Sequence, residues 1–156
     1  MSEERIDTVV IGAGQAGLGV SRELVGRGVE HVVLERGRIG ETWRSQRWDA
    51  FALNSPAWMN LLPGDATPER PDGFPSAPQF VLGLQRYAFR HRLPVREGVA
   101  VRSVDRGSTD DWLLVATDEG VLQARSVVVA SPSIPLIIPI RRCPTDARCC
   151  TSPDVA

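Results

Sequence analysis

Hydrophobic positions near the N-terminus change from a strand pattern to a helical pattern and back again. Ile6 to Ile11 is a β-branched apolar run that ends at a glycine, which is typical of a buried strand. From Gln15 to Arg27 the apolar residues recur at helical spacing, and Gly28 stands where glycine commonly ends a helix. His31 to Leu34 is a second apolar run, closed by Glu35. This order of elements predicts a right-handed βαβ unit with parallel strands.

The next part of the chain divides into an irregular stretch, a helix and several short strands. Residues 36–78 lack clear periodicity, so we expect a binding region of loops there. Gln79 to Arg92 has one apolar face and predicts a helix. Short apolar runs predict four strands, at Val99–Val104, Trp112–Thr117, Val121–Ala124 and Val127–Ala130. The first three indicate an antiparallel meander, and the fourth indicates a return to the parallel sheet.

Together these elements predict an α/β fold with two regions of different character. Residues 1–130 form a Rossmann-like domain, with a parallel sheet, flanking helices and a small antiparallel meander. Residues 131–156 hold five of the twelve prolines and all three cysteines, and they show neither a helical nor a convincing strand pattern. We therefore expect an irregular tail. No C-x-x-C pair or histidine accompanies the cysteines, so we expect no metal site.

Composition narrows the class of protein without naming a function. The 156 residues suffice for one domain, and 42% hydrophobic with 24% charged residues is the balance of a globular protein. The net charge of −1 argues against nucleic acid or an anionic membrane as partner. All eighteen basic residues are arginine, which excludes a P-loop lysine and a Schiff-base lysine. The acidic start and the short apolar runs argue against a signal peptide or a membrane span, so we expect a cytoplasmic location.

The strongest motif is the glycine loop between the first strand and the first helix, Gly12-Ala13-Gly14-Gln15-Ala16-Gly17. In this G-x-G-x-x-G pattern Gly12 permits the tight turn, and Gly14 removes a side chain where backbone must approach a diphosphate. Gly17 allows helix and strand to pack closely. The start of the helix then presents N–H groups and a partial positive charge to the phosphates.

The acid at the end of the second strand completes this fingerprint. Glu35 lies 23 residues after Gly12, where a carboxylate can accept hydrogen bonds from both ribose hydroxyls. The same carboxylate disfavours a 2′-phosphate, so the site should not take NADP. The fingerprint alone leaves FAD and NAD open.

The segment after the second strand carries a family resemblance. Gly40-Glu41-Thr42-Trp43-Arg44 resembles the G-G-x-W-x segment of flavin-containing monooxygenases and related FAD-dependent NAD(P)H oxidoreductases. Residues 48–64 continue the match, since Phe51-Ala52-Leu53-Asn54-Ser55-Pro56 and Leu62-Pro63-Gly64 are similar to a block of bacterial flavoproteins in that superfamily. The resemblance runs from about Ile6 to Ala130.

The resemblance implies FAD as cofactor. Members of the family reduce their FAD with NADPH, and the reduced flavin activates O2 to oxygenate a small-molecule substrate. Carried over by position, it adds residues at the ribose, the adenine and the flavin to those of the glycine loop. The residues predicted to contact the cofactor are then Gly12, Ala13, Gly14, Gln15, Ala16, Gly17, Glu35, Arg36, Gly40, Thr42, Trp43, Val101 and Ala130.

Asn54 stands where the family places an asparagine beside the flavin. An amide at that position can donate and accept hydrogen bonds near the reacting ring, which makes Asn54 the candidate catalytic residue. The alternative is a turn asparagine that precedes Ser55-Pro56, since asparagine and X-Pro are ordinary turn formers.

The remaining tryptophans and both histidines are expected to have no role in ligand binding. Trp112, in a predicted meander strand, is expected in the core, and Trp48 and Trp58 are expected to pack the loop. His31 and His91 lack a partner acid or cysteine in view, and both are expected at the surface.

The resemblance breaks at the end of the last predicted strand. The family has Ala-Thr-Gly there, whereas this chain has Ala130-Ser131-Pro132, and proline lacks both the N–H and the freedom of glycine. The second glycine loop, which binds NADPH in the family, has no counterpart in this chain. We expect a truncated FAD-binding domain whose tail is read out of frame, with an uncovered sheet edge that favours self-association.

The sequence therefore predicts an FAD-dependent oxidoreductase of the flavin monooxygenase type, present as its N-terminal part. A non-catalytic FAD-binding fragment or remnant, and the binding domain of an NAD-dependent dehydrogenase, remain the alternatives. The substrate is left open.

Overall fold

The computed structural model describes residues 4–48, 50–107 and 112–131, and it confirms the predicted α/β fold. Its strands are β1 (Glu4–Ile11), β2 (His31–Glu35), β3 (Val95–Glu97), β4 (Val101–Arg106), β5 (Leu113–Thr117) and β6 (Val121–Val129). Its helices are α1 (Gln15–Gly26), α2 (Glu41–Ser45) and α3 (Ala77–Arg90), with a 3-10 helix, η1, at Ala57–Asn60.

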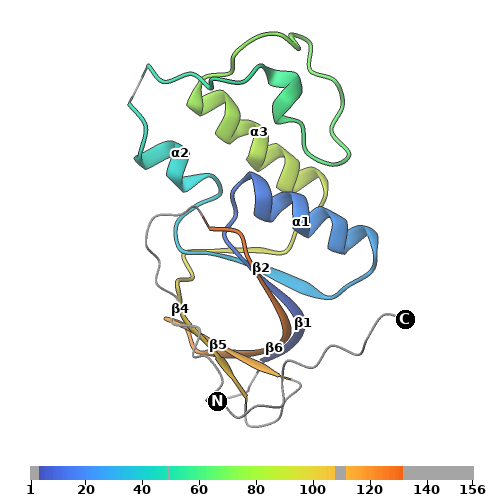
Figure 1. Ribbon diagram of the computed structural model, residues 1–156, viewed down its shortest axis with the longest axis vertical. Helices are drawn as coiled ribbons and strands as arrows, with labels where there is room; N and C mark the ends of the chain where they lie inside the picture. The colour runs from blue at the N-terminus through green and yellow to red at the C-terminus, as the bar shows by residue number, and fades with distance from the viewer. Residues whose placement is uncertain (1–3, 49, 108–111, 132–156) are drawn as a thin grey trace, which may run out of the picture.

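One six-stranded sheet holds all of these strands, in the order β3-β2-β1-β6-β5-β4. The first four of that order run parallel, whereas β5 pairs antiparallel with both β6 and β4. The predicted βαβ unit is present, with α1 connecting the adjacent parallel strands β1 and β2 (Figure 1). Because β1, β2 and β6 are parallel, their carboxyl ends reach the same edge of the sheet.

One continuous strand, β6, replaces the two strands predicted at Val121–Ala124 and Val127–Ala130. Arg125 and Ser126 interrupt the apolar pattern but not the ladder, because a strand is held by backbone hydrogen bonds and these two side chains are exposed. The prediction of a break was therefore wrong. The same strand pairs with β5 along its first half and with β1 along nearly its whole length, so it carries the chain from the meander into the parallel sheet without a turn.

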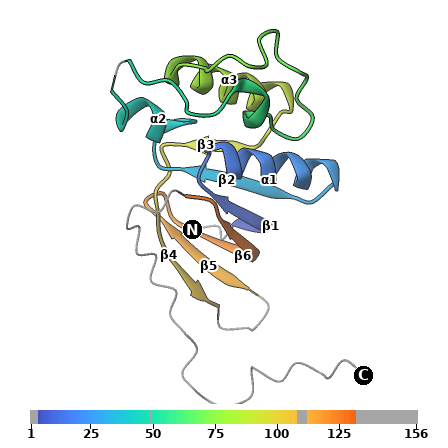
Figure 2. The same cartoon turned by 45° about the horizontal axis from the view of Figure 1, so that its top comes forward.

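Helices cover one face of the parallel strands, and the antiparallel strands curl around the other face (Figure 2). On the first face Val10 and Val33 pack with Leu18 of α1 and with Leu84 and Tyr87 of α3. All five side chains are at most 2% exposed, so this helix-side core fixes α1 and α3 against the sheet.

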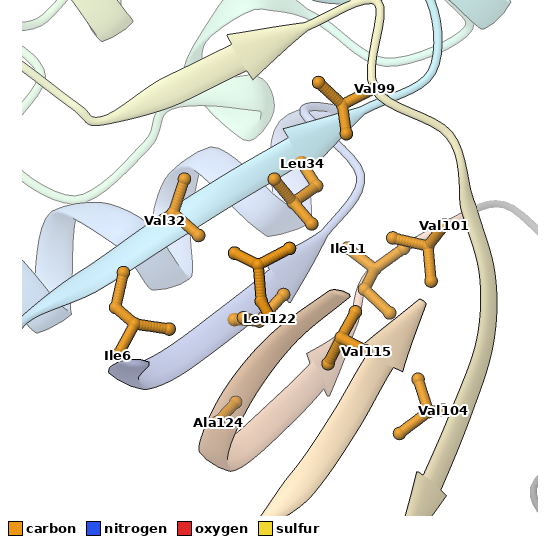
Figure 3. Close-up of a cluster of buried hydrophobic side chains, with 11 residues drawn as sticks. Ile6, Ile11, Val32, Leu34, Val99, Val101, Val104, Val115, Leu122 and Ala124 are labelled. Atoms are coloured by element: carbon orange, nitrogen blue, oxygen red, sulfur yellow. The ribbon is translucent and has the colours of Figure 1, made fainter. Parts of the chain in front are cut away.

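A second core lies between the parallel strands and the meander (Figure 3). Ile11 and Leu34, near the ends of β1 and β2, meet Val101 of β4, Val115 of β5 and Leu122 of β6. This meander-side core packs the antiparallel strands against the parallel strands of the same sheet.

Residues 36–78 contain more regular structure than predicted. They include the short helix α2, the 3-10 helix η1 and an isolated bridge between Ala52 and Ser76. Helix α3 begins at Ala77, two residues earlier than predicted, because Ser76 caps it. The Ser76 hydroxyl accepts the Gln79 N–H, and the Gln79 side chain accepts the Ser76 N–H, which forms a capping box.

Strand β3 was missed by sequence reasoning. It has three residues, Val95–Glu97, which is too short to show an alternating pattern. It forms by pairing in parallel with β2, so its existence depends on a neighbour that is distant in sequence.

His31 is buried, which corrects the prediction of a surface residue. Its Nε2 lies 2.8 Å from the Ser21 hydroxyl, and its Nδ1 lies 2.9 Å from the Val29 carbonyl oxygen. Because both ring nitrogens have partners, the polar imidazole is buried between α1 and β2 at little cost.

Trp112 is half-buried beside β5, which corrects the prediction of a core residue. The guanidinium carbons of Arg5 and Arg125 lie 5.4 and 5.3 Å from the centre of its ring. Cation–π contacts therefore hold this side chain at the edge of the sheet.

His91 directly follows α3 and is half-buried, not at the surface as predicted. Its ring packs edge-on against Tyr87 with 4.6 Å between ring centres, and its Nε2 is buried without a hydrogen-bond partner among the described residues. Burial lowers the pKa of His91, and the charges of Arg22 and Arg90 lower it further, while Asp65 opposes them.

We expect His91 to make the free energy of unfolding fall as the pH drops below about 6.5. Because its pKa is lower in the folded than in the unfolded state, the unfolded state takes up the proton first. Stability is therefore full above the unfolded value and is lost as the pH falls through it towards the folded value. Thermal unfolding between about pH 7.5 and 5.5 measures this loss. His91→Gln should flatten the slope, and equal slopes in the two proteins would contradict the assignment.

Strand β6 has an open side near its end, in the part of the chain that the structure describes. Residues 121–124 pair with β5, whereas residues 126–129 pair with β1 alone. Val129 is 53% exposed there. Because β6 lies inside the strand order of the sheet, this open side is not an outer edge, and both the uncovered edge and self-association through it stay predictions. All but the first residue of the tail predicted for residues 131–156 lies outside the described residues. Among the helices of the described residues, none could span a membrane.

Candidate functional site

At two positions of the loop after β1, neighbouring backbone leaves no room for a side chain. Gly12 has φ +104°, and a Cβ there would lie 2.8 Å from the Ala130 carbonyl oxygen at the end of β6. A Cβ on Gly17 would lie only 1.9 Å from the carbonyl oxygen of Gly12. The predicted roles of these glycines, a tight turn at Gly12 and close packing at Gly17, are confirmed.

Gly14 differs from them because nothing lies within 4 Å of the position that its Cβ would take. Its φ of −85° and ψ of −172° are extended values that other residues also adopt, so the backbone does not require glycine there. Gly14 is the N-cap of α1 and makes no side-chain capping bond. The free space therefore lies at the helix start, where the first N–H groups lack intrahelical acceptors.

The Glu35 carboxylate lies beside the glycine loop and is held by two backbone N–H groups. Its Oε2 accepts the Ala13 N–H at 2.9 Å, and its Oε1 accepts the Gly37 N–H at 2.9 Å. Each oxygen keeps capacity for a further hydrogen bond. The carboxylate is thus oriented before any ligand arrives.

A cleft of about 640 Å³ opens at this edge of the sheet between the glycine loop, α2 and the start of β4. Eleven of the thirteen residues predicted to contact the cofactor line it, namely Gly12, Gly14, Gln15, Ala16, Glu35, Arg36, Gly40, Thr42, Trp43, Val101 and Ala130. The tertiary structure therefore brings together residues from four separate parts of the chain.

The other predicted residues lie elsewhere. Ala13 and Gly17 are buried behind the loop, where Ala13 donates to Glu35 and Gly17 packs against Gly12. Asn54 is exposed and does not line the cleft, so its catalytic role stays a prediction.

Trp43 lines the cleft and also joins α2 to α3. Its ring meets Phe80 of α3 edge-on at 5.0 Å and lies 5.8 Å from Phe51. The Arg47 guanidinium carbon lies 5.0 Å from the centre of the same ring. Trp48 is 68% exposed and packs edge-on against Phe51, as predicted for a loop contact.

Sequence reasoning missed a polar part of the cleft wall, formed by Ser45 at the end of α2, by Gln46 and Arg47 after it, and by Arg102 on β4. Arg47 lies four residues after Trp43, and a cation at helical spacing from an aromatic side chain was the available signal. Arg102 gave no comparable signal, because the meander pattern shows only which positions are apolar.

A family model described as pyridine nucleotide-disulphide oxidoreductase matches residues 9–133. The chain belongs to this family. The match includes the glycine loop, Glu35, α2, α3 and all six strands, in whole or in part.

Curated relatives of the chain include an oxidoreductase and a monooxygenase. The chain is 34% identical over 127 residues to an uncharacterized oxidoreductase CzcO-like of Geobacillus kaustophilus, covering 81% of this chain and 36% of the relative. It is 35% identical over 137 residues to the indole-3-pyruvate monooxygenase YUCCA1 of Oryza sativa subsp. japonica, covering 83% of this chain and 34% of that protein. The chain thus spans little more than a third of the length of these relatives.

Among solved structures, a flavin-containing monooxygenase from Stenotrophomonas maltophilia superposes with a TM-score of 0.68 at 29% identity. The superposition covers 81% of this chain and 38% of the monooxygenase. The fold of this family member is therefore that of the corresponding part of a flavin monooxygenase.

Proposed function

We propose that the cleft is the FAD-binding site of a flavin-dependent oxidoreductase of the monooxygenase type. One observation carries the proposal: the start of α1 at Gly14 borders free space in the same cleft as a carboxylate that two backbone N–H groups already hold in place. A dinucleotide with a diphosphate beside a ribose fits this pair of features.

The diphosphate is assigned to the start of α1. A Cβ at Gly14 would occupy the space next to the helix N-terminus, and Gln15 and Ala16 continue the cleft wall from there. The partial positive charge of the helix start and its unpaired N–H groups favour an anion at this position.

The ribose and the adenine are assigned to the side of the cleft formed by Glu35 and Val101. With one lone pair of each carboxylate oxygen occupied by Ala13 and Gly37, the remaining capacity suits two neighbouring ribose hydroxyls. A 2′-phosphate would meet this carboxylate as a like charge, which disfavours NADP in the cleft.

The flavin end is assigned to the wall that Gly40, Thr42 and Trp43 contribute. When bound, FAD would supply a redox-active ring for two-electron transfer, chemistry that protein side chains lack. The residues of this chain would bind and orient it: Thr42 offers a hydroxyl, and Trp43, fixed by Phe80, offers a rigid wall. Reduction by NADPH and oxygenation of a small molecule are proposed only for a protein of the length of the relatives.

Titration with FAD tests the proposal. We expect the purified chain to bind FAD with quenching of flavin fluorescence, and acid treatment to release it as free flavin. Gly14→Leu should weaken binding at least about a hundredfold, because the side chain fills the space assigned to the diphosphate.

Gly83→Leu is the matched control for this experiment. Gly83 is also a glycine with nothing within 4 Å of its Cβ position, but it lies on the exposed side of α3 outside the cleft. Equal affinities of the Gly14 and Gly83 variants would contradict the assignment. Release of NAD instead of flavin from the denatured protein would favour the binding domain of a dehydrogenase.

A further inference from the structure

The loop between β2 and α2 is held by an unbroken series of hydrogen bonds from its backbone. Gly37 N–H donates to Glu35, Arg38 N–H donates to Glu41 Oε2 at 3.2 Å, and Gly40 N–H donates to the Ala13 carbonyl at 3.2 Å. We call residues 36–40 the β2–α2 loop. Within it, Gly40 adopts φ +70° and packs against α3, so the course of this loop sets the wall of the cleft.

One acceptor in this series comes from a distant part of the chain. Ile39 N–H donates to Glu97 Oε1 at 2.7 Å, although Glu97 lies 58 residues later, on β3. The other acceptors of the loop are the Glu35 and Glu41 side chains, next to its two ends, and the Ala13 carbonyl in the glycine motif. Glu97 therefore connects the middle of the loop to the sheet.

The same loop fixes the backbone of the glycine motif on both sides of Ala13. Ala13 N–H donates to Glu35 Oε2, and the Ala13 carbonyl accepts the Gly40 N–H. Because peptide units are planar and this chain has no cis peptide bond in its described part, the Gly14 N–H must point opposite to the Ala13 carbonyl. A shift of the β2–α2 loop would thus turn the first amide assigned to the diphosphate.

We propose that Glu97 is a positioning residue for the dinucleotide site. By accepting the Ile39 N–H, it holds the β2–α2 loop in the course that lets Gly40 fix the Ala13 peptide. Glu97 itself does not line the cleft. The inference deepens the proposed FAD function and, for its effect on affinity, rests on it.

Substitution of Glu97 tests this role by two measurements on the same proteins. Glu97→Ala removes the acceptor, whereas Glu97→Gln keeps an amide oxygen that can still accept the Ile39 N–H. Glu69→Ala is the matched control for loss of an exposed carboxylate. We expect Glu97→Ala to weaken FAD binding roughly tenfold and Glu97→Gln to restore most of the affinity.

Amide hydrogen exchange of the chain without FAD supplies the second measurement. In Glu97→Ala the Gly40 and Ala13 amides should exchange at least about tenfold faster than in the unchanged chain, while in Glu69→Ala they should not. Unchanged exchange at both amides would overturn the inference, whether or not the chain binds FAD. If the unchanged chain binds FAD, an equal affinity of Glu97→Ala would overturn it as well. Faster exchange in a chain that fails to bind FAD would support the positioning role and reject only the proposed function.

Discussion

Replacing Gly17 with alanine should prevent stable folding, or lower the free energy of unfolding by about 3 kcal/mol or more. The new Cβ would lie 1.9 Å from the Gly12 carbonyl oxygen, which is backbone and cannot turn aside as a flexible side chain could. Gly17 is itself buried at the start of α1, and Gly12 is fixed in turn by Ala130. Relief would therefore require α1 to move away from β1 and the helix-side core to open.

Thermal unfolding measures this effect, with Gly83→Ala as the control. Both changes place one methyl group in a helix, but nothing lies within 4 Å of a Cβ on Gly83. The control should therefore gain up to about 1 kcal/mol from helix propensity. A Gly17→Ala protein that melts within about 2 °C of the unchanged chain would show that the contact between α1 and the glycine loop is not as close as described.

Replacing Glu35 with alanine should weaken FAD binding about a hundredfold. Two hydrogen bonds to the ribose would be lost, and the Ala13 and Gly37 N–H groups would lose their acceptor at the same time. The glycine loop would then lose one of the hydrogen bonds that orient it, so both the ribose contact and the proposed diphosphate contact should weaken.

Fluorescence titration with FAD, well below the unfolding temperature, checks this expectation. Glu35→Gln keeps the size of the side chain and one strong acceptor, so its affinity should fall between that of the alanine variant and the unchanged chain. Glu30→Ala removes an exposed acid just before β2 and should leave the affinity unchanged. An unaltered affinity in Glu35→Ala would remove the ribose assignment and, with it, the preference for FAD over NADP.

Most of the candidate site was predictable because its parts are local. The glycine loop is contiguous, and the close contacts at Gly12 and Gly17 confirm the steric roles that the motif predicts for these two glycines. Glu35 was predictable because it is the acidic residue that ends the second strand of the βαβ unit. The prediction that Thr42 and Trp43 contact the cofactor came from a family resemblance, and both residues line the cleft.

The remaining parts depend on partners that are distant in sequence. Strand β3 exists because β2 pairs with it, and Glu97 on it reaches Ile39 across 58 residues. His31 was predicted at the surface because its partner Ser21, on α1, reaches it only when the helix packs against β2. Arg47 and Arg102 line the cleft because of how α2 packs and how the meander curves. The hydrophobic pattern of the sequence does not show either arrangement.

The sequence by itself determined the βαβ unit, its glycine loop and its acidic strand end, because backbone sterics, glycine freedom and apolar periodicity act over a few residues. Only the tertiary structure decided which side chains share the cleft, how the β2–α2 loop is held, and that β6 runs unbroken from the meander into the parallel sheet. Those features arise from backbone pairing and side-chain packing between distant segments, whose free energy no single stretch of sequence contains.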